Sequence, residues 1–181
     1  VYVEGGVQIN REIYLGFVLD RSSQRVMIVS SAEGGMEIED ISANKPESIV
    51  RSTVEPAVGL QDFQCRQIAF KLGIDPVLTQ SMVRTLQGCY RAFREYDATM
   101  VEINPLVVTE DNRILALDAK MTFDDNALFR HPYISELRDK SQEDPRESRA
   151  ADRGLSYVGL EGNIGCIVNG AVSYTHLRAH E

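Results

Sequence analysis

Apolar and polar residues alternate along residues 11–31, REIYLGFVLDRSSQRVMIVSS, on both sides of a polar turn that contains Ser and Gln. Alternation of this kind is typical of half-buried strands, and two such runs around a short turn predict a β-hairpin. In the next run, EGGMEIEDI (33–41), a Gly-Gly turn precedes Met36, Ile38 and Ile41. We expect another short strand there.

The pattern then changes to helical spacing. LQDFQCRQIAFKLGI (60–74) predicts one helix, with Gly73 at the position of a C-terminal cap and with apolar residues Leu60, Phe63, Ile68, Ala69 and Leu72. DPVLTQSMVRTLQGCYRAFREYD (75–97) predicts a long amphipathic helix that Asp75 caps and Pro76 begins. Its apolar stripe, which we interpret as core, consists of Leu78, Met82, Leu86, Tyr90 and Phe93.

Two further β-rich runs, TMVEINPLVVT (99–109) and RILALDAKM (113–121), flank the polar turn EDN and predict a second hairpin. If that hairpin is centred near Asp111, Asn104 falls opposite Asp118 or one step away. Cross-strand neighbours have Cβ atoms about 5 Å apart. Glu102, two residues before Asn104, points to the same face by alternation. One amide and two carboxylates therefore converge on a small patch of sheet.

Converging oxygen ligands without cysteine or histidine suit a hard cation such as Mg²⁺, which is commonly held by one or two carboxylates together with substrate phosphates. An exposed hairpin with scattered polar residues would show the same spacing, so spacing does not separate the two interpretations. The chain lacks a GxxxxGK[ST] phosphate loop, and EGG (33–35) and EGNIG (161–165) are weak motifs. A nucleotide site would therefore be of another kind than the Walker type.

Composition narrows the class of protein. A net charge of −8 argues against a nucleic-acid surface, which needs clustered Lys and Arg. The chain has no apolar run of the roughly 20 residues that a membrane helix requires. Three cysteines without a CxxC pattern, Cys65, Cys89 and Cys166, argue against a disulfide framework or a zinc site. Reduced thiols favour a cytoplasmic protein of bacterial type, with a mitochondrial location as the alternative.

Several motifs, in the right order, resemble the β subunits of succinate–CoA ligase and its relative malate–CoA ligase. They include EIYLGFVLDRSSQRV, SSAEGGMEIEDI, QIAFKLGI, MVEINPLVVTEDNRILALDAKMTFDDNALFRHP, SQEDPRE and GNIGCIVNGA. The resemblance implies an α/β fold: the C-terminal part of an α+β ATP-grasp domain, followed by the beginning of a flavodoxin-like CoA-ligase domain. The ranges implied are 1–135 for the ATP-grasp part, 136–154 for a connecting segment with a short helix, and 155–171 for a strand, turn and strand that begin the second domain.

The same resemblance assigns roles to individual residues. Asn104 and Asp118 match the two Mg²⁺ ligands, and Glu102 matches a catalytic carboxylate that meets a phosphorylated histidine. Glu4, Val7 and Glu12 match residues that bind ATP or ADP, Val7 through its backbone. Asn169 matches a residue that binds the organic acid, a small dicarboxylate. The phosphohistidine and the CoA site belong to a partner α subunit, and we interpret His131 of this chain as structural or superficial.

Three alternatives stay open. The acid is succinate or malate. The enzyme could instead be another ATP-grasp ligase, such as a carboxylate–amine ligase or ATP-citrate lyase, although NIGCIVNGA argues against the former. Finally, the chain could be a truncated, non-catalytic piece, because the early part of the ATP-grasp domain is expected to lie outside it. Residues 172–181, which include SYTHLRAHE, are expected to be a non-native tail.

Overall fold

The computed structural model describes residues 5–138, 144–155, 157–159 and 162–167. The chain divides into two compact units, residues 1–136 and 137–181.

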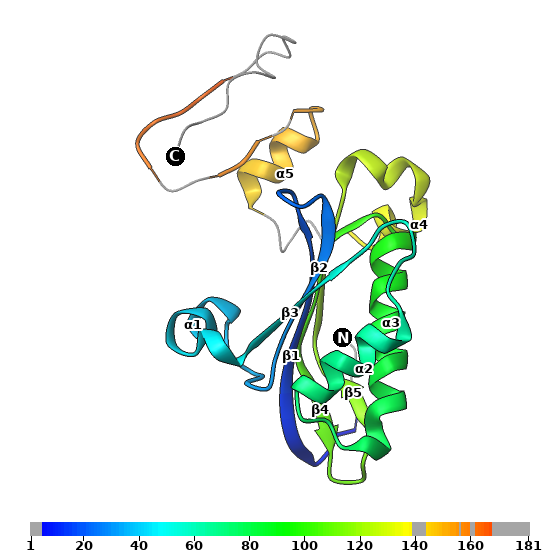
Figure 1. Ribbon diagram of the computed structural model, residues 1–181. Helices are drawn as coiled ribbons and strands as arrows, with labels where there is room; N and C mark the ends of the chain where they lie inside the picture. Colours follow the sequence, from blue (N-terminus) through cyan, green and yellow to red (C-terminus); the bar gives the residue numbers. More distant parts are fainter. Residues whose placement is uncertain (1–4, 139–143, 156, 160–161, 168–181) are drawn as a thin grey trace. The chain divides into compact units, whose positions relative to one another are not determined.

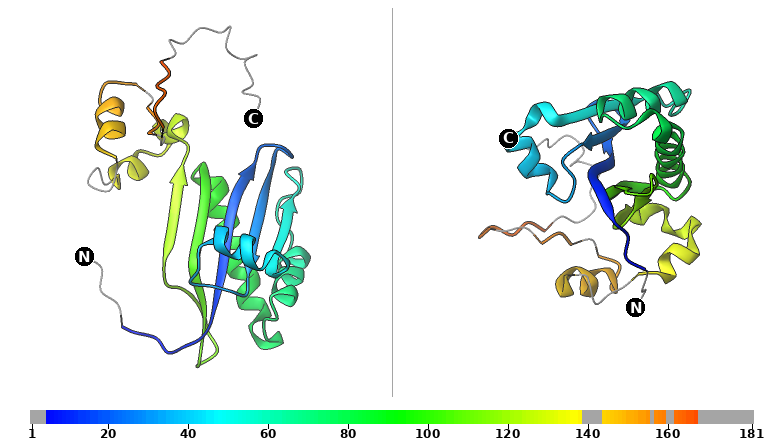
Figure 2. Two further views of the ribbon diagram at one scale, coloured as in Figure 1. Left: turned by 90° about the vertical axis from the view of Figure 1, so that its left-hand side faces the viewer. Right: turned by 90° about the horizontal axis from the view of Figure 1, so that it is seen from below.

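The first unit is built on a six-stranded sheet in which all paired strands are antiparallel (Figures 1 and 2). The strand order is β3-β2-β1-β4-β5, and β6 also pairs with β4. The strands are β1 (Ile9–Asp20), β2 (Arg25–Ser31), β3 (Ile49–Val54), β4 (Ala98–Thr109), β5 (Ile114–Ala116) and β6 (Ala119–Phe123). Both predicted hairpins are confirmed: β1 pairs with β2, and β4 pairs with the two short strands that follow it.

Helices lie on both sides of this sheet. On one side are α2 (Asp62–Lys71) and α3 (Thr79–Glu95), and on the other is the short α1 (Ile38–Asn44), as Figure 1 shows. The remaining helical segments of the unit are the 3₁₀ turns η1 (Pro46–Ser48), η2 (Pro76–Leu78) and η3 (Asp125–Arg130), and α4 (Pro132–Glu136).

The hydrophobic core lies between the sheet and helices α2 and α3. Ile13, Leu15 and Phe17 alternate along β1, so all three point to this side, and each is fully buried. The predicted stripe of α3 is confirmed, since Leu78, Met82, Leu86, Tyr90 and Phe93 are all buried in the same cluster. Each large apolar side chain buried in this way contributes about 1.5–3 kcal/mol to folding.

The predicted capping residues lie at the ends of the helical segments, but Asp75 caps the 3₁₀ turn η2, and helix α3 itself begins only at Thr79. Asp75 accepts a hydrogen bond from the N–H of Val77 at 2.9 Å, immediately before Pro76. Gly73 follows α2 with φ of +66°, a conformation that glycine adopts without strain. The guanidinium of Arg11, on β1, donates to the carbonyls of Leu72 and Gly73, so the end of α2 is tied to the sheet.

One apolar residue assigned to the core face of α2 lies elsewhere. Phe63 is 54% exposed, because the face turned to the sheet is formed by Cys65, Ile68, Ala69 and Leu72. Phe63 and Phe70, seven residues apart, share the outer face of the helix.

The strand predicted after the Gly-Gly turn was wrong: the structure has helix α1 from Ile38 to Asn44. Met36 and Ile38 fit a period of two, but Ile38 and Ile41 are three apart and lie on one face of a helix. Glu39 and Asp40 in the first turn favour the helix, because carboxylates there complement its dipole. Only Ile41 of this segment is fully buried.

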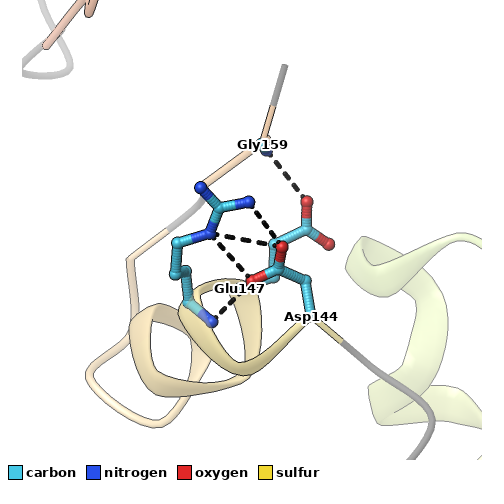
Figure 3. Close-up of polar contacts among 4 residues, drawn as sticks. Asp144, Glu147 and Gly159 are labelled. Atoms are coloured by element: carbon cyan, nitrogen blue, oxygen red, sulfur yellow. Dashed lines mark hydrogen bonds and ion pairs between the residues drawn. The ribbon is translucent and has the colours of Figure 1, made fainter. Parts of the chain in front are cut away.

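The second unit contains α5 (Pro145–Ala151), the short helix predicted for the connecting segment. Asp144 caps it by accepting the N–H of Arg146 at 2.7 Å and also pairs with the Arg146 guanidinium; these interactions lower the pKa of Asp144 to about 2. Glu147 accepts the N–H of Gly159 at 3.0 Å (Figure 3). The described residues between 155 and 167 form neither of the two strands expected there.

In the part of the chain that the structure describes, no helix has the length and apolarity to cross a membrane.

Candidate functional site

A β-bulge in the centre of the sheet organises the predicted site. Ile13 pairs with Leu106 and Leu15 pairs with Ile103, so Asn104 and Pro105 of β4 together oppose the single residue Tyr14 of β1. In a regular strand, residues three apart point to opposite faces. Because of the extra residue, Ile103 and Leu106 both point to the core. Bulges occur frequently beside active sites, where they re-aim a side chain.

On its other edge, β4 pairs with β5 and β6 in the register predicted from the sequence. Leu106 pairs with Ala116 and Ile103 pairs with Ala119, which places Asn104 opposite Asp118 at the interruption between β5 and β6. The predicted juxtaposition of this amide and this carboxylate is therefore confirmed. Asp118 is exposed and Asn104 is half-buried.

The side chain of Asn104 is held by the turn that precedes α1. Its Oδ1 accepts the N–H of Gly35 at 2.9 Å and its Nδ2 donates to the carbonyl of Met36 at 3.0 Å. The turn also lies close against β1, because the N–H of Gly34 donates to the carbonyl of Glu12 at 3.3 Å. A Cβ on Gly34 would overlap the backbone of Ile13, and one on Gly35 would overlap the carboxylate of Glu12. Glu12 and Asn104 thus both lie against Gly35.

Glu102 lies on the same side of the sheet, between Gly16 of β1 and Lys120 of β6, with which it pairs. The Tyr14 hydroxyl lies over Gly16, since a Cβ built on Gly16 would be 3.0 Å from it. Burial and the negative charge of Glu102 raise the pKa of Tyr14 above its usual value, and Glu39 and Glu37 add to the effect. Tyr14 is 6% exposed and therefore stays protonated.

These residues define what we call the site face, the side of the sheet opposite α2 and α3. Its members are Glu12, Tyr14, Gly16, Glu102 and Asn104, with Asp118 and Lys120 at its exposed edge. The sequence predicted that Glu102, Asn104 and Asp118 would converge, and the family resemblance assigned Glu12 to nucleotide binding; the structure brings all four to one face. Tyr14 and the turn 34–36 were not predicted. The signal for Tyr14 was its spacing of two residues from both Glu12 and Gly16 in a strand.

The other predicted residues lie outside this face or outside the described residues. Val7 is half-buried and precedes β1 without contributing to the sheet. Glu4 and Asn169 lie outside the described residues, as does the expected tail, residues 172–181, so these assignments stay predictions.

The donor set of the site face fits a hard cation. Asn104 Oδ1 has two lone pairs, of which the N–H of Gly35 uses one, and Asp118 is accessible to solvent. No group of three His, Cys, Asp or Glu side chains that could hold a metal occurs among the residues described by the structure. Two protein oxygens, with the other positions left to phosphate and water, match the way Mg²⁺ is commonly bound with nucleotides.

His131 has a structural environment. Its Nε2 lies 2.7 Å from Asp97 Oδ2, and its ring stacks edge-on against Tyr96 at a centroid distance of 6.0 Å. Arg130 approaches the same carboxylate oxygen at 2.9 Å. These contacts agree with the structural interpretation of His131.

Two hollows in the described surface lie away from the site face. One, of about 540 Å³, is lined by α3 residues that include Arg84, Arg91 and Arg94. The other, of about 440 Å³, lies along the outer face of α2 at Phe63 and Phe70. Both are on the helical side of the sheet, so we assign the site from the converging polar side chains instead of from these hollows.

Residues 1–108 match the ATP-grasp domain family. The chain belongs to the ATP-grasp family. The antiparallel sheet with helices on its faces has the mixed α/β content of an ATP-grasp domain.

Curated relatives of this ATP-grasp chain match 171 residues of it. A protein of Mesorhizobium japonicum, named probable malate–CoA ligase subunit beta, is 65% identical over 94% of this chain and 43% of its own length. The ADP-forming succinate–CoA ligase subunits beta of Nitratiruptor sp. and Rickettsia massiliae are 52% and 51% identical, each over 94% of this chain and 44% of their own length. The chain thus spans less than half the length of these relatives.

A solved structure shows the same fold. The ATP citrate lyase of Methanothrix soehngenii, in complex with citrate and coenzyme A, superposes with a TM-score of 0.57 at 17% identity, over 82% of this chain and 34% of that one. At this identity the likeness concerns the fold alone.

Proposed function

We propose that this ATP-grasp chain is part of the β subunit of an acid–CoA ligase. The reaction is succinate + CoA + ATP ⇌ succinyl-CoA + ADP + phosphate, through a phosphohistidine on a partner α subunit, in the cytoplasm. The β subunit supplies the Mg²⁺–nucleotide site. Supporting the proposal are relatives of that name at 51–52% identity along nearly the whole chain.

The observation that carries the proposal is the convergence on the site face. The register of β4 with β5 and β6 sets Asn104 opposite Asp118, and Glu102 and Glu12 lie on the same face of two adjacent strands. A solvated hairpin with scattered polar residues would not also order a turn 69 residues away against its amide.

Each side chain has a role in this proposal. Asn104 and Asp118 hold Mg²⁺, which offsets the negative charge of the nucleotide phosphates when it is bound. Glu12, with Glu4 and the backbone of Val7, binds the nucleotide. Glu102 is the catalytic carboxylate that receives the partner subunit's histidine, and Asn169 contacts the dicarboxylate.

The charges of these side chains agree with the roles that the proposal gives them. A single carboxylate in the ligand pair leaves net positive charge on the metal for the phosphates. Glu102 has Lys120 opposite it in the register of β4 and β6, and a carboxylate at this place is well suited to orient a cationic imidazolium.

A malate–CoA ligase is the second candidate. The 65% identity to the M. japonicum protein, compared with 52% to the Nitratiruptor succinate enzyme, supports malate as the alternative acid. The organic acid would contact mainly residues beyond the described sheet, so the site face itself serves either substrate.

The experiment is a substrate comparison with the full-length β subunit coexpressed with its α subunit. CoA-dependent ADP formation is measured separately with succinate and malate, in the presence and absence of Mg²⁺. We expect turnover that requires Mg²⁺, with kcat/KM for one acid clearly exceeding that for the other. No turnover with either acid by a folded complex would reject both assignments.

Two variants separate the site from general damage. Asp118→Ala should abolish Mg²⁺-dependent turnover, since one of two metal ligands is lost. Asp125→Ala is the matched control, an exposed aspartate in η3 on the same unit, and should retain the parental activity. Equal loss in the two variants would argue against a metal role for Asp118.

A further inference from the structure

A basic hollow lies on the helical side of the sheet, away from the site face. Its volume of about 540 Å³ is within the range of small-molecule sites, roughly 300–1,000 Å³. Helix α3 forms one wall, and the loop between β3 and α2 contributes Pro56 and Gly59. In a chain of net charge −8, this hollow is lined by a single carboxylate, Glu95, and by three arginines, Arg84, Arg91 and Arg94.

Gly88 lies in this lining, in the middle of α3. A Cβ built on Gly88 would meet no atom within 4 Å, so the space above its backbone is open. Glycine in a helix interior is less favourable than alanine, and no close contact at this position requires the absence of a side chain. Stability therefore does not explain this glycine, whereas the space that it leaves in the hollow does. Arg84 and Arg91, four residues before and three residues after it, lie on the same face of the helix.

Hydrogen bonds and close packing fix the walls of the hollow. Gln87 Nε2 donates to the carbonyl of Leu60 at 2.9 Å and to Asp62 Oδ1 at 3.1 Å, which ties α3 to the beginning of α2. Gly59, with φ of +70°, lies close to Tyr90, since a Cβ there would be 3.5 Å from Cε1 of the ring. The hollow is therefore formed by segments that hold one another in place.

Two of the arginines are oriented by neighbouring hydroxyl groups. Arg94 Nη1 donates to the hydroxyl of the buried Tyr90 at 3.1 Å, and its guanidinium lies 6.0 Å from the centre of that ring. Arg84 Nη2 donates to Ser81 Oγ at 3.0 Å. A guanidinium has five N–H donors, so each keeps several for another partner. Within the described ranges, neither of them forms an ion pair with a carboxylate, and neither does Arg91.

The spacing of the three charges indicates what such a hollow can bind. Arg91 and Arg94 are three residues apart, and like charges at this spacing destabilise a helix unless an anion compensates them. Guanidinium groups bind phosphate and carboxylate through paired hydrogen bonds. Arg84 is seven residues before Arg91, about 10 Å along the helix axis. A molecule with two or more anionic groups therefore fits the three arginines better than a single small ion does.

We propose that the hollow over Gly88 is a binding site for a small molecule that carries two or more phosphate or carboxylate groups. Arg91 and Arg94 bind one anionic end and Arg84 binds the other, while Pro56 and the ring of Tyr90 contact the part between them. This site is separate from the proposed ligase chemistry, because it lies on the opposite side of the sheet and requires no Mg²⁺.

The test is isothermal titration calorimetry of the full-length β subunit with its α subunit, so that any surface covered in the assembly is covered in the experiment. EDTA is present to remove Mg²⁺-dependent binding at the site face. The probes are inorganic diphosphate and tricarballylate, which distinguish phosphate from carboxylate groups. We expect at least one probe to bind at a site that is lost in Gly88→Leu, because the leucine side chain fills the hollow without changing its charge.

The arginine variants test the two ends of the site. Arg84→Gln and Arg91→Gln should each raise the Kd of this site about 10-fold or more, since each removes a charge-assisted hydrogen bond. The matched control is Arg66→Gln, an exposed arginine on the outer face of α2 that lines the other hollow and undergoes the same change of charge. It should keep the Kd of the parent.

Binding and folding are measured on the same samples. Melting temperatures of the arginine variants close to that of the parent show that a weaker titration comes from the site and not from unfolding. Titrations of the parent that match those of Gly88→Leu and Arg91→Gln, with both probes, would overturn the proposal. An equal loss of affinity in Arg66→Gln would also overturn it, because the binding would then reflect diffuse surface charge. Turnover is not the readout, so failure of the ligase assignment and failure of this site are distinguishable.

Discussion

The side-chain amide of Asn104 is bonded twice to a turn 69 residues earlier in the chain, through Oδ1 to the N–H of Gly35 and through Nδ2 to the carbonyl of Met36. The turn 34–36 and the site face therefore move together. Any change that displaces this turn also displaces the oxygen that is proposed to bind Mg²⁺.

Gly35→Ala should disturb this junction. Gly35 has φ of +71°, and an added Cβ would overlap the Glu12 carboxylate. We expect a loss of stability of more than about 1 kcal/mol, because alanine is strained at positive φ and Glu12 must also move. Urea unfolding of the purified chain measures it. An unchanged midpoint would show that the turn is not packed on Glu12.

Gly88→Ala should stabilise the protein and serves as a control for the Gly35→Ala substitution. Gly88 lies inside α3, and a Cβ there would meet no atom within 4 Å. We expect a gain of about 0.5–1 kcal/mol, since glycine in a helix interior is less favourable than alanine by that amount. The same urea titration applies, and a decrease in stability would contradict the open space found at this position.

The Asp97 carboxylate predicts a pH dependence of stability. The hydrogen bond with His131 and the proximity of Arg130 lower its pKa below the usual 3.8. A group whose folded-state pKa is lowered contributes stability above its unfolded-state pKa, and this contribution is lost as pH falls through the folded-state value. Asp97→Asn should therefore lower the melting temperature at pH 7, with a difference from the parent that shrinks as the pH falls below the usual pKa of 3.8 and is lost once the pH has passed the lowered folded-state pKa.

Asparagine is the matched substitution at this position. Asp97 has φ of +50°, which asparagine tolerates better than most residues, so backbone strain does not confuse the comparison. A difference between parent and variant that stays constant from neutral to acid pH would show that charge on Asp97 does not stabilise the fold.

The three cysteines should react at different rates. Burial raises the pKa of both Cys65 and Cys89 from 9.0 to about 11, which lowers their thiolate fraction about 100-fold at neutral pH. Cys166 is exposed. With iodoacetamide at neutral pH, mass spectrometry should find Cys166 modified first and the other two only after denaturation. Equal rates in the native protein would contradict the burial of the thiols.

The hairpins and long helices were predictable because their signals are local. Strict alternation marks β1 and β2, and the stripe from Leu78 to Phe93, with Asp75 as cap, marks α3. The register of β4 with its two partners followed from a single assumption, that the turn is centred near Asp111. Turn position fixes register in a hairpin, so the pairing of Asn104 with Asp118 needed no tertiary information.

Other features were not readable in this way. Helix α1 was mistaken for a strand, because its few apolar residues fit both the period of a strand and that of a helix. Only the packing of Ile41 decides between strand and helix. Phe63 was placed in the core although the helix turns Cys65 and Ile68 to the sheet. Composition does not say which face of a short helix is covered.

By itself, the sequence determined the strands of the two hairpins, the register of the second hairpin and the meeting of Asn104, Asp118 and Glu102, since each depends on alternation and on a nearby turn. Only the tertiary structure decided which group completes the site. The bulge opposite Tyr14, the ring of Tyr14 over Gly16 and the attachment of residues 34–36 to Asn104 join segments far apart in the chain. Such contacts are set by the packing of one strand against another, and no local pattern encodes them.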